Sequence, residues 1–134
     1  MFYPLVLQKV VDGYVVLVPD VAGCYSAGDT FAEALNNAKE AIALHIESLI
    51  EDGEEIPPAT PLENHQANPE FAEGFLFSGV DVDLSHLMGK AEKINITLPS
   101  RLIRRIDAFV AQNPQYKSRS GFLAKVATDR IFAV

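Results

Sequence analysis

The sequence predicts an α+β protein in two parts: a small antiparallel-rich sheet with one long helix, then a strand-helix-helix segment. Three observations support this fold class. Residues 1–85 hold short β-rich runs between turn residues and one long helical pattern. Residues 93–99 alternate between polar and apolar side chains, and two amphipathic helical patterns follow them. The charge also changes sign, from a net −13 over residues 1–89 to +6 over the rest.

The chain begins with a predicted β-hairpin. Residues 3–11 and 14–18 are rich in β-branched and bulky side chains, and the dipeptide Asp12-Gly13 between them is a strong two-residue turn signal. Residues 24–27 then predict a third short strand. These runs indicate that the first sheet is built mainly from neighbouring segments.

The longest helix of the chain is predicted to begin at Thr30. Thr30 and Glu33 have the spacing of a capping box, and Gly53 supplies the stop signal. The expected buried face consists of apolar residues and one histidine at helical spacing: Phe31, Leu35, Ala38, Ile42, His45 and Leu49.

Beyond this helix the sequence predicts a loop, a strand and a linker. The proline-bearing segment 56–70 is expected to be irregular. Residues 75–84 predict the last strand of the first domain, with a bulge at Ser78-Gly79. The domain boundaries are therefore predicted as 1–85 for the first domain, 86–92 for the linker and 93–134 for the second domain.

The short strand predicted over 93–99 has two different faces. Its apolar side chains can be buried on one side: Ile94, Ile96 and Leu98. Its polar side chains point the other way: Lys93, Asn95 and Thr97. Because a lone strand leaves backbone groups unpaired on both sides, a second copy of the same strand is the simplest partner. The strand therefore predicts a dimer.

Two helices are predicted after this strand. Pro99 can open the first, which the pair Asn113-Pro114 breaks, and Ser118 is a suitable N-cap for the second, expected to run nearly to Val134. The segment resembles the ribbon-helix-helix DNA-binding family, in which two protomers pair their strands into a ribbon that enters the major groove. The resemblance rests on residues 93–99, on residues 117–123 and on three residues of the first helix. These three are Leu102, Ile106 and Asp107.

This resemblance implies roles for two groups of residues. The outward side chains of the strand would read base edges: Lys93, Asn95 and Thr97. The start of the second helix would hold DNA phosphate, because a helix N-terminus has free N–H groups and a partial positive charge. The residues placed there are Ser118, Arg119 and Ser120.

A second resemblance covers residues 1–85. It rests on Gly13-Tyr14, Pro19-Asp20, Gly23-Cys24, the run 28–30, Glu33-Ala34, Ala38 and the later proline loop. Together these resemble the antitoxin domain of HicB proteins, a truncated RNase H-like fold. The resemblance implies a type II antitoxin that binds a small basic HicA-like ribonuclease toxin and represses its own operon as a dimer.

The residues that contact such a toxin are not identified by this resemblance, although the helix and the loop after it offer acidic side chains as candidates: Glu33, Glu40, Glu47, Glu51, Asp52, Glu54 and Glu55. The alternative interpretation is a transcriptional regulator whose first domain senses a small molecule in an apolar pocket.

A hydrolase is the third possibility, with four carboxylates as ligands for Mg²⁺: Asp12, Asp20, Asp81 and Asp83. Two of these lie at turns that favour aspartate, and two alternate on an expected solvent face, so a structural role is favoured. The histidines and Cys24 have no zinc-site spacing. We therefore expect no enzyme activity, no metal and no cofactor.

The single cysteine and the absence of a long apolar run set the expected compartment. Cys24 suits a reducing cytoplasm and is expected to be a buried thiol. No signal peptide is expected before Met1-Phe2-Tyr3-Pro4, and no apolar run approaches a membrane span of about 20 residues. The sequence thus predicts a cytoplasmic protein.

Overall fold

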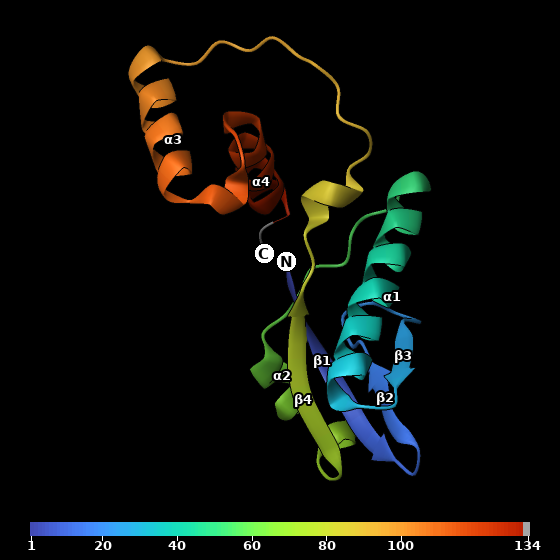
Figure 1. Ribbon diagram of the computed structural model, residues 1–134. Coiled ribbons are helices and arrows are strands. Elements are labelled where there is room, and N and C mark those ends of the chain that lie inside the picture. Colours follow the sequence, from blue (N-terminus) through green and yellow to red (C-terminus); the bar gives the residue numbers. More distant parts are fainter. Residues whose placement is uncertain (133–134) are drawn as a thin grey trace. The chain divides into compact units, whose positions relative to one another are not determined.

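The computed structural model describes residues 1–132, which divide into two compact units between Leu87 and Met88 (Figure 1). The first unit contains a four-stranded sheet and a long helix, and the second contains two helices. The α+β class that the sequence predicts is confirmed. Among residues 1–132, every helix is either too short or too polar to span a lipid bilayer.

The sheet of the first unit is antiparallel and has the strand order β3-β2-β1-β4. Its strands are β1 (Phe2–Val10), β2 (Gly13–Leu17), β3 (Tyr25–Gly28) and β4 (Phe75–Asp81). A tight hairpin joins β1 to β2, where Val10 pairs with Gly13, so its two turn residues are Val11 and Asp12 and not the predicted Asp12-Gly13. A Cβ at Gly13 would lie 2.3 Å from the carbonyl oxygen of Gly28, and its φ is 148°, so this position requires glycine.

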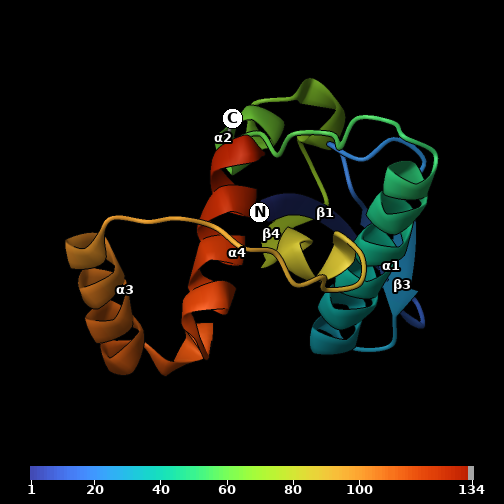
Figure 2. The same ribbon diagram turned by 90° about the horizontal axis from the view of Figure 1, so that it is seen from above.

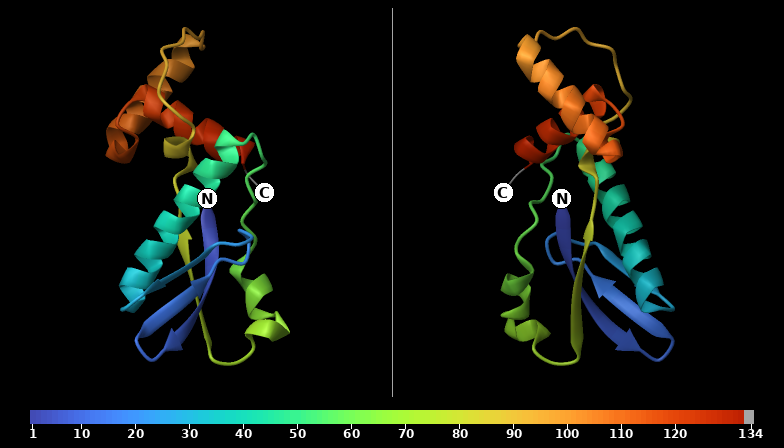
Figure 3. Two further views of the ribbon diagram at one scale, coloured as in Figure 1. Left: turned by 90° about the vertical axis from the view of Figure 1, so that its right-hand side faces the viewer. Right: turned by 60° about the vertical axis from the view of Figure 1, so that its left-hand side comes forward.

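Helix α1 (Phe31–Glu51) begins as the sequence predicts. The hydroxyl of Thr30 accepts a hydrogen bond of 3.1 Å from the backbone N–H of Glu33. The helix packs on one face of the sheet (Figures 1 and 3). A Cβ on Gly28 would lie 2.4 Å from the backbone nitrogen of Ala34, so β3 and α1 approach each other closely at this point.

The buried face of α1 includes the predicted Ala38 and Ile42 but differs from the prediction elsewhere. Its buried residues repeat every fourth position: Ala34, Ala38, Ile42 and Ile46. Phe31 is 37% exposed and His45 is half-buried, so neither belongs to the buried centre of this face. The reason is the small size of Ala34 and Ala38, which lets the helix backbone come close to the sheet.

The segment after α1 is more regular than the sequence predicts. It contains the short helix α2 (Leu62–Gln66) and the 3-10 turn η1 (Pro69–Phe71) within the expected irregular loop. Figure 3 shows α2 on the opposite side of the sheet from α1. A helix of five residues gives no apolar repeat to detect, so its periodicity is invisible in the sequence.

Tyr3 connects the segment after α1 to the sheet through a hydrogen bond. Its side chain is fully buried, and its hydroxyl donates a hydrogen bond of 2.7 Å to the carbonyl oxygen of Pro57. Burial raises the pKa of the Tyr3 phenol to about 12, and the nearby carboxylate of Asp20 contributes in the same direction. The phenol is therefore held neutral in the folded chain.

The Tyr3→Phe variant is expected to be less stable than the wild type by about 1 kcal/mol at neutral pH, because one buried hydrogen bond is removed. Above pH 10.0 the unfolded chain loses the phenol proton while the folded chain keeps it up to about pH 12. The stability of the wild type should therefore fall across this interval, and the fall should be smaller in Tyr3→Phe. Urea unfolding at several alkaline pH values measures the free energy of unfolding of both proteins. The prediction would be contradicted if this free energy fell equally steeply with pH in the two.

Strand β4 is shorter than predicted and has no bulge. It ends at Asp81, and its register with β1 continues through Ser78, paired with Leu5, and Gly79, paired with Pro4. The chain then forms the 3-10 turn η2 (Leu84–Leu87), which overlaps the start of the predicted linker. Val82 and Leu84 are buried, so the end of the first unit packs into its core.

The second unit contains α3 (Ser100–Gln112), the 3-10 turn η3 (Pro114–Tyr116) and α4 (Arg119–Ile131). Figure 2 shows α3 and α4 side by side, joined by η3. Both helices begin where the sequence predicts. The predicted extension of the second helix toward Val134 includes residues 133–134, which lie outside the described residues.

The strand predicted over 93–99 is not formed in the single chain. Residues 88–99 belong to no helix or strand, and the apolar side chains of Ile94 and Ile96 are 75% and 58% exposed. A strand exists only as part of a hydrogen-bonded ladder, and the described part of the second unit contains no other strand to pair with it.

Candidate functional site

The three predicted base-reading side chains lie on one exposed segment. Lys93, Asn95 and Thr97 are exposed, and they alternate with Ile94 and Ile96. The segment leads directly into α3, whose N-cap is Pro99. It is therefore anchored at its C-terminal end.

An aromatic cluster fixes the corner between α3 and α4. The rings of Phe109, Tyr116 and Phe122 contact one another in pairs, with centroids 5.3 to 5.8 Å apart. These rings come from α3, η3 and α4, so the cluster ties all three elements together. Ile106 adds the most deeply buried apolar side chain described in this unit.

The turn before α4 depends on a left-handed residue and a glycine. Lys117 has φ of 67°, and Gly121 lies so close to the turn that a Cβ would meet the carbonyl oxygen of Tyr116 at 2.1 Å. The hydroxyl of Ser118 accepts a hydrogen bond of 3.1 Å from the N–H of Gly121, which caps the helix. Ser118, Arg119 and Ser120 are all exposed at this N-terminus.

The Ser118→Ala variant is expected to lose about 1 kcal/mol of stability, because the N–H of Gly121 loses its capping acceptor. The Ser120→Ala variant is the matched control, since it removes an exposed hydroxyl from the same helical turn and leaves the cap in place. Thermal unfolding of the full chain, followed by helical circular dichroism, measures both. Equal losses in the two variants would contradict the capping role.

Arg119 forms a bidentate ion pair with Asp107 of α3. Its Nε and one terminal nitrogen donate to the two carboxylate oxygens of Asp107 at 3.0 and 2.7 Å. These hydrogen bonds hold the pKa of the Asp107 carboxyl below its usual value and raise the pKa of Arg119. Both side chains are 48% exposed, so the pair orients the guanidinium at the surface.

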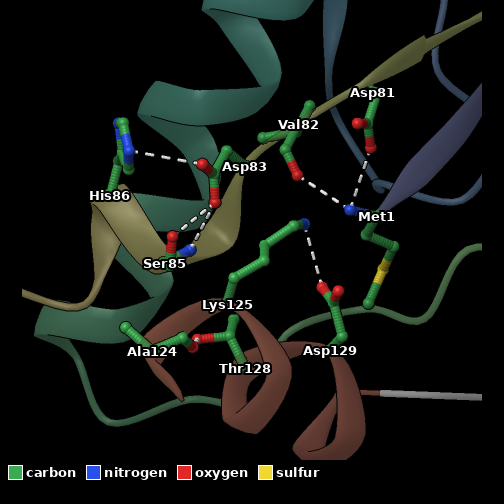
Figure 4. A network of polar contacts seen from close by, with 10 residues as sticks. All are labelled: Met1, Asp81, Val82, Asp83, Ser85, His86, Ala124, Lys125, Thr128 and Asp129. Carbon is green, nitrogen blue, oxygen red and sulfur yellow. Dashed lines mark hydrogen bonds and ion pairs between the residues drawn. The ribbon is translucent and has the colours of Figure 1, made fainter. Parts of the chain in front are cut away.

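The four aspartates considered as a metal cluster are not gathered in space. Asp81 pairs with the terminal ammonium of Met1 at 3.2 Å, while Asp83 accepts from Ser85 and contacts His86 at 3.3 Å (Figure 4). Among residues 1–132, no group of three His, Cys, Asp or Glu side chains is placed to hold a metal ion.

A buried polar cluster in the first unit was missed by sequence reasoning. The carboxylate of Asp20 accepts hydrogen bonds from the backbone N–H of Thr60 at 2.7 Å and from its hydroxyl at 2.8 Å. Nε2 of His65 lies 2.8 Å from the Thr60 hydroxyl and 3.2 Å from Asp20. The side chains of Asp20 and His65 are only 7% and 14% exposed. Thr60 and His65 lie 40 and 45 positions after Asp20, so no local spacing signals the cluster.

Three further polar or titratable groups have defined surroundings: Lys125, Thr128 and Cys24. On α4, Lys125 pairs with Asp129 at 3.0 Å, and the buried hydroxyl of Thr128 donates to the carbonyl oxygen of Ala124 (Figure 4). In the first unit Cys24 is buried as predicted, and this burial raises the pKa of its thiol.

Comparison with known proteins places the chain in a family. The family described as "HicB_like antitoxin of bacterial toxin-antitoxin system" matches residues 3–127. A 14.9 kDa protein encoded in the rep-hol intergenic region of Haemophilus phage HP1 is 57% identical over 133 residues, which are 99% of each chain.

Solved structures agree with this placement. The crystal structure of the Burkholderia pseudomallei antitoxin HicB matches with a TM-score of 0.77 and 41% identity, over 95% of this chain and 96% of that one. A chain of the HicA3 and HicB3 toxin-antitoxin complex matches with a TM-score of 0.57 and 36% identity, over 62% of this chain and 99% of that one. With the family match over most of its length and a relative similar from end to end, this chain belongs to the HicB-like antitoxin family of bacterial toxin-antitoxin systems.

Proposed function

We propose that this chain is a type II antitoxin that acts in the cytoplasm, neutralises a HicA-like ribonuclease toxin and represses its own operon as a DNA-bound dimer. The observation that carries the proposal is the division of charge. The acidic first part, with a net −13, suits a basic partner protein, and the basic last part, with +6, suits DNA. The complex of HicA3 with HicB3, a relative of this chain, supports the choice of toxin.

Toxin binding is assigned to the first unit. Its strong negative charge would steer a basic, RNA-binding protein toward it and speed the encounter. We infer that its sheet and helix form a truncated RNase H-like fold that serves as a binding scaffold. Neutralisation then requires only that the bound antitoxin covers the toxin's RNA-binding surface, so the antitoxin needs no catalytic group, metal or cofactor.

DNA binding and dimerisation are assigned to the second unit, which we infer to be a ribbon-helix-helix domain. Two copies of the segment 93–99 would pair as an antiparallel ribbon, which would satisfy their backbone groups and cover the exposed Ile94 and Ile96. The same pairing would direct the polar side chains together into the major groove, as other β-ribbon proteins do. Lys93 suits guanine, Asn95 suits adenine, and Thr97 can contact either kind of base.

The start of α4 is assigned to the DNA backbone. Ser118, Arg119 and Ser120 lie at its exposed N-terminus, where the helix dipole favours an anion. A guanidinium has five N–H donors, and the ion pair with Asp107 uses two of them, so Arg119 keeps donors for phosphate.

The Arg119→Ala variant is expected to bind operator and random DNA less tightly by similar factors, because phosphate contacts carry no sequence information. The slope of log affinity against log salt should fall by about 0.9 for each phosphate that the variant no longer neutralises. Asp107→Asn is the matched control: it weakens the same ion pair but keeps the cation, so its salt slope should match the wild type. DNA titration of both variants at several salt concentrations tests these expectations. If Arg119→Ala lost affinity for operator DNA but kept its affinity for random DNA, the assignment of Arg119 to phosphate would be contradicted.

A growth assay tests the proposed function as a whole. We predict that a short reading frame for a small basic protein lies beside the one for this chain. That frame is expressed from an inducible promoter, with and without this chain. Growth should stop when the neighbouring frame is expressed alone and resume when the chain is co-expressed. Absence of rescue, with both proteins present in the cell, would contradict the antitoxin function.

A further inference from the structure

Among residues 1–132, none forms a backbone hydrogen bond with the outer edge of β4, the last strand of the sheet. Val82, just after β4, exchanges two hydrogen bonds of 2.8 Å with Met1, so its N–H and C=O point toward the β1 side. Because hydrogen-bonded pairs alternate along an antiparallel ladder, the backbone N–H and C=O groups of Val80 and Ser78 also point toward β1. The alternate residues of β4 direct their N–H and C=O groups outward: Phe75, Phe77, Gly79 and Asp81.

This edge has little of the usual protection against strand pairing, because Asp81 at its end is the single charged residue of β4. The seven residues of β4 include no lysine, arginine or proline, and the register with β1 contains no bulge. The opposite edge differs, because β3 has only four residues and its Ala27 carbonyl already accepts a hydrogen bond of 2.8 Å from the Asn37 side chain of α1. Within the described chain, β4 is therefore the edge open to a further strand.

The charge around β4 selects the kind of strand. Glu70 and Glu73 are exposed just before it, and Asp81 at its end is 70% exposed although it also contacts the terminal ammonium. A second copy of β4 would bring a second acidic first part, also at net −13, against these carboxylates. A strand with basic residues at its ends would instead be attracted.

We propose that the basic toxin of the proposed function, on which this inference rests, adds a β-strand to the outer edge of β4 and extends the sheet to five strands. The backbone groups of Phe75, Phe77, Gly79 and Asp81 provide the hydrogen bonds, and the carboxylates at the two ends of the strand select a basic partner. Toxin binding then uses a surface separate from the residues assigned to DNA.

Amide hydrogen exchange of the full chain tests this, with the purified product of the adjacent reading frame as the probe. In the free chain, the amides of Leu76, Ser78 and Val80 should exchange slowly, and those of Phe77, Gly79 and Asp81 quickly. Binding of the probe should slow the second group by at least about tenfold.

The possible outcomes separate this inference from the proposed function. A complex that leaves the outward amides unchanged would overturn the inference alone, whereas failure to form any complex would overturn both. Outward amides that are already slow in the free chain, and become fast on dilution, would show that a second copy occupies the edge and would also overturn it.

A matched pair of variants provides an independent readout. Phe77→Pro removes one outward N–H and leaves the inward ladder to β1, while Phe77→Ala removes the same side chain and keeps the N–H. The proline variant should bind the probe about tenfold more weakly than the alanine variant, because residue 77 can no longer donate its N–H to a carbonyl oxygen of the added strand. Equal affinities in two variants with equal unfolding temperatures would overturn the proposal.

Discussion

Replacing Ile96 by lysine is expected to abolish dimerisation of the full chain and to lower its affinity for operator DNA by about a hundredfold or more. Ile96 is 58% exposed in the single chain and would be covered in a paired ribbon. Burial of one such side chain contributes about 1.5 to 3 kcal/mol, and the dimer contains two of them. A lysine at this position would place an unpaired cation in the same interface, which weakens the dimer further.

Sedimentation and DNA titration of the same samples measure this effect. The matched control is Val11→Lys, which adds a lysine at a fully exposed apolar position in the hairpin turn of the first unit. The control should dimerise and bind DNA as the wild type does. A dimeric Ile96→Lys variant with wild-type DNA affinity would contradict the ribbon.

The Asn95→Ala variant is expected to reduce discrimination between operator and random DNA by about 1 to 3 kcal/mol for each bidentate hydrogen-bonded pair with a base that it removes. This corresponds to a factor of roughly 5 to 150 in the affinity ratio. Asn95 is exposed in the single chain, so the substitution removes no packing within the second unit. The stability of the unit should therefore stay within about 0.5 kcal/mol of the wild type.

Competition binding with both DNA sequences gives the affinity ratio directly. An equal loss of affinity for operator and random DNA would assign Asn95 to the DNA backbone and contradict base reading. Arg119→Ala is the useful comparison, because removing a phosphate-binding group should lower both affinities and leave their ratio unchanged.

Local signals in the sequence predict much of the fold. The cap of α1 at Thr30 and the cap of α4 at Ser118 are found where the sequence places them, and the predicted hairpin is found with its turn one position earlier. Each depends on residues only a few positions apart, which set the local backbone conformation or form hydrogen bonds with nearby backbone groups. Such features can be read without knowledge of the rest of the chain.

Features set by contacts between distant segments could not be read in this way. The buried face of α1 is fixed by the close approach of Gly28 to Ala34, which the apolar pattern of the helix does not reveal. The Asp20 cluster joins Thr60 and His65 from a segment that the sequence predicts to be irregular. Both depend on how the chain folds back on itself.

The strand predicted over 93–99 illustrates a different limit. Its alternating pattern is clear in the sequence, yet the single chain forms no strand there. The pattern records which side chains would share a face, whereas the hydrogen bonds that define a strand require a partner. For this segment the sequence predicts a strand that would form only in the proposed dimer, and this strand stays a prediction.

A titration of RNA cleavage tests the antitoxin function most directly. The purified product of the adjacent reading frame is incubated with RNA, and the purified full chain is added in increasing amounts. Cleavage should stop when the chain reaches a molar ratio of about one to the toxin, as tight binding requires. Cleavage that continues with the folded chain in large excess would contradict the function proposed for this protein.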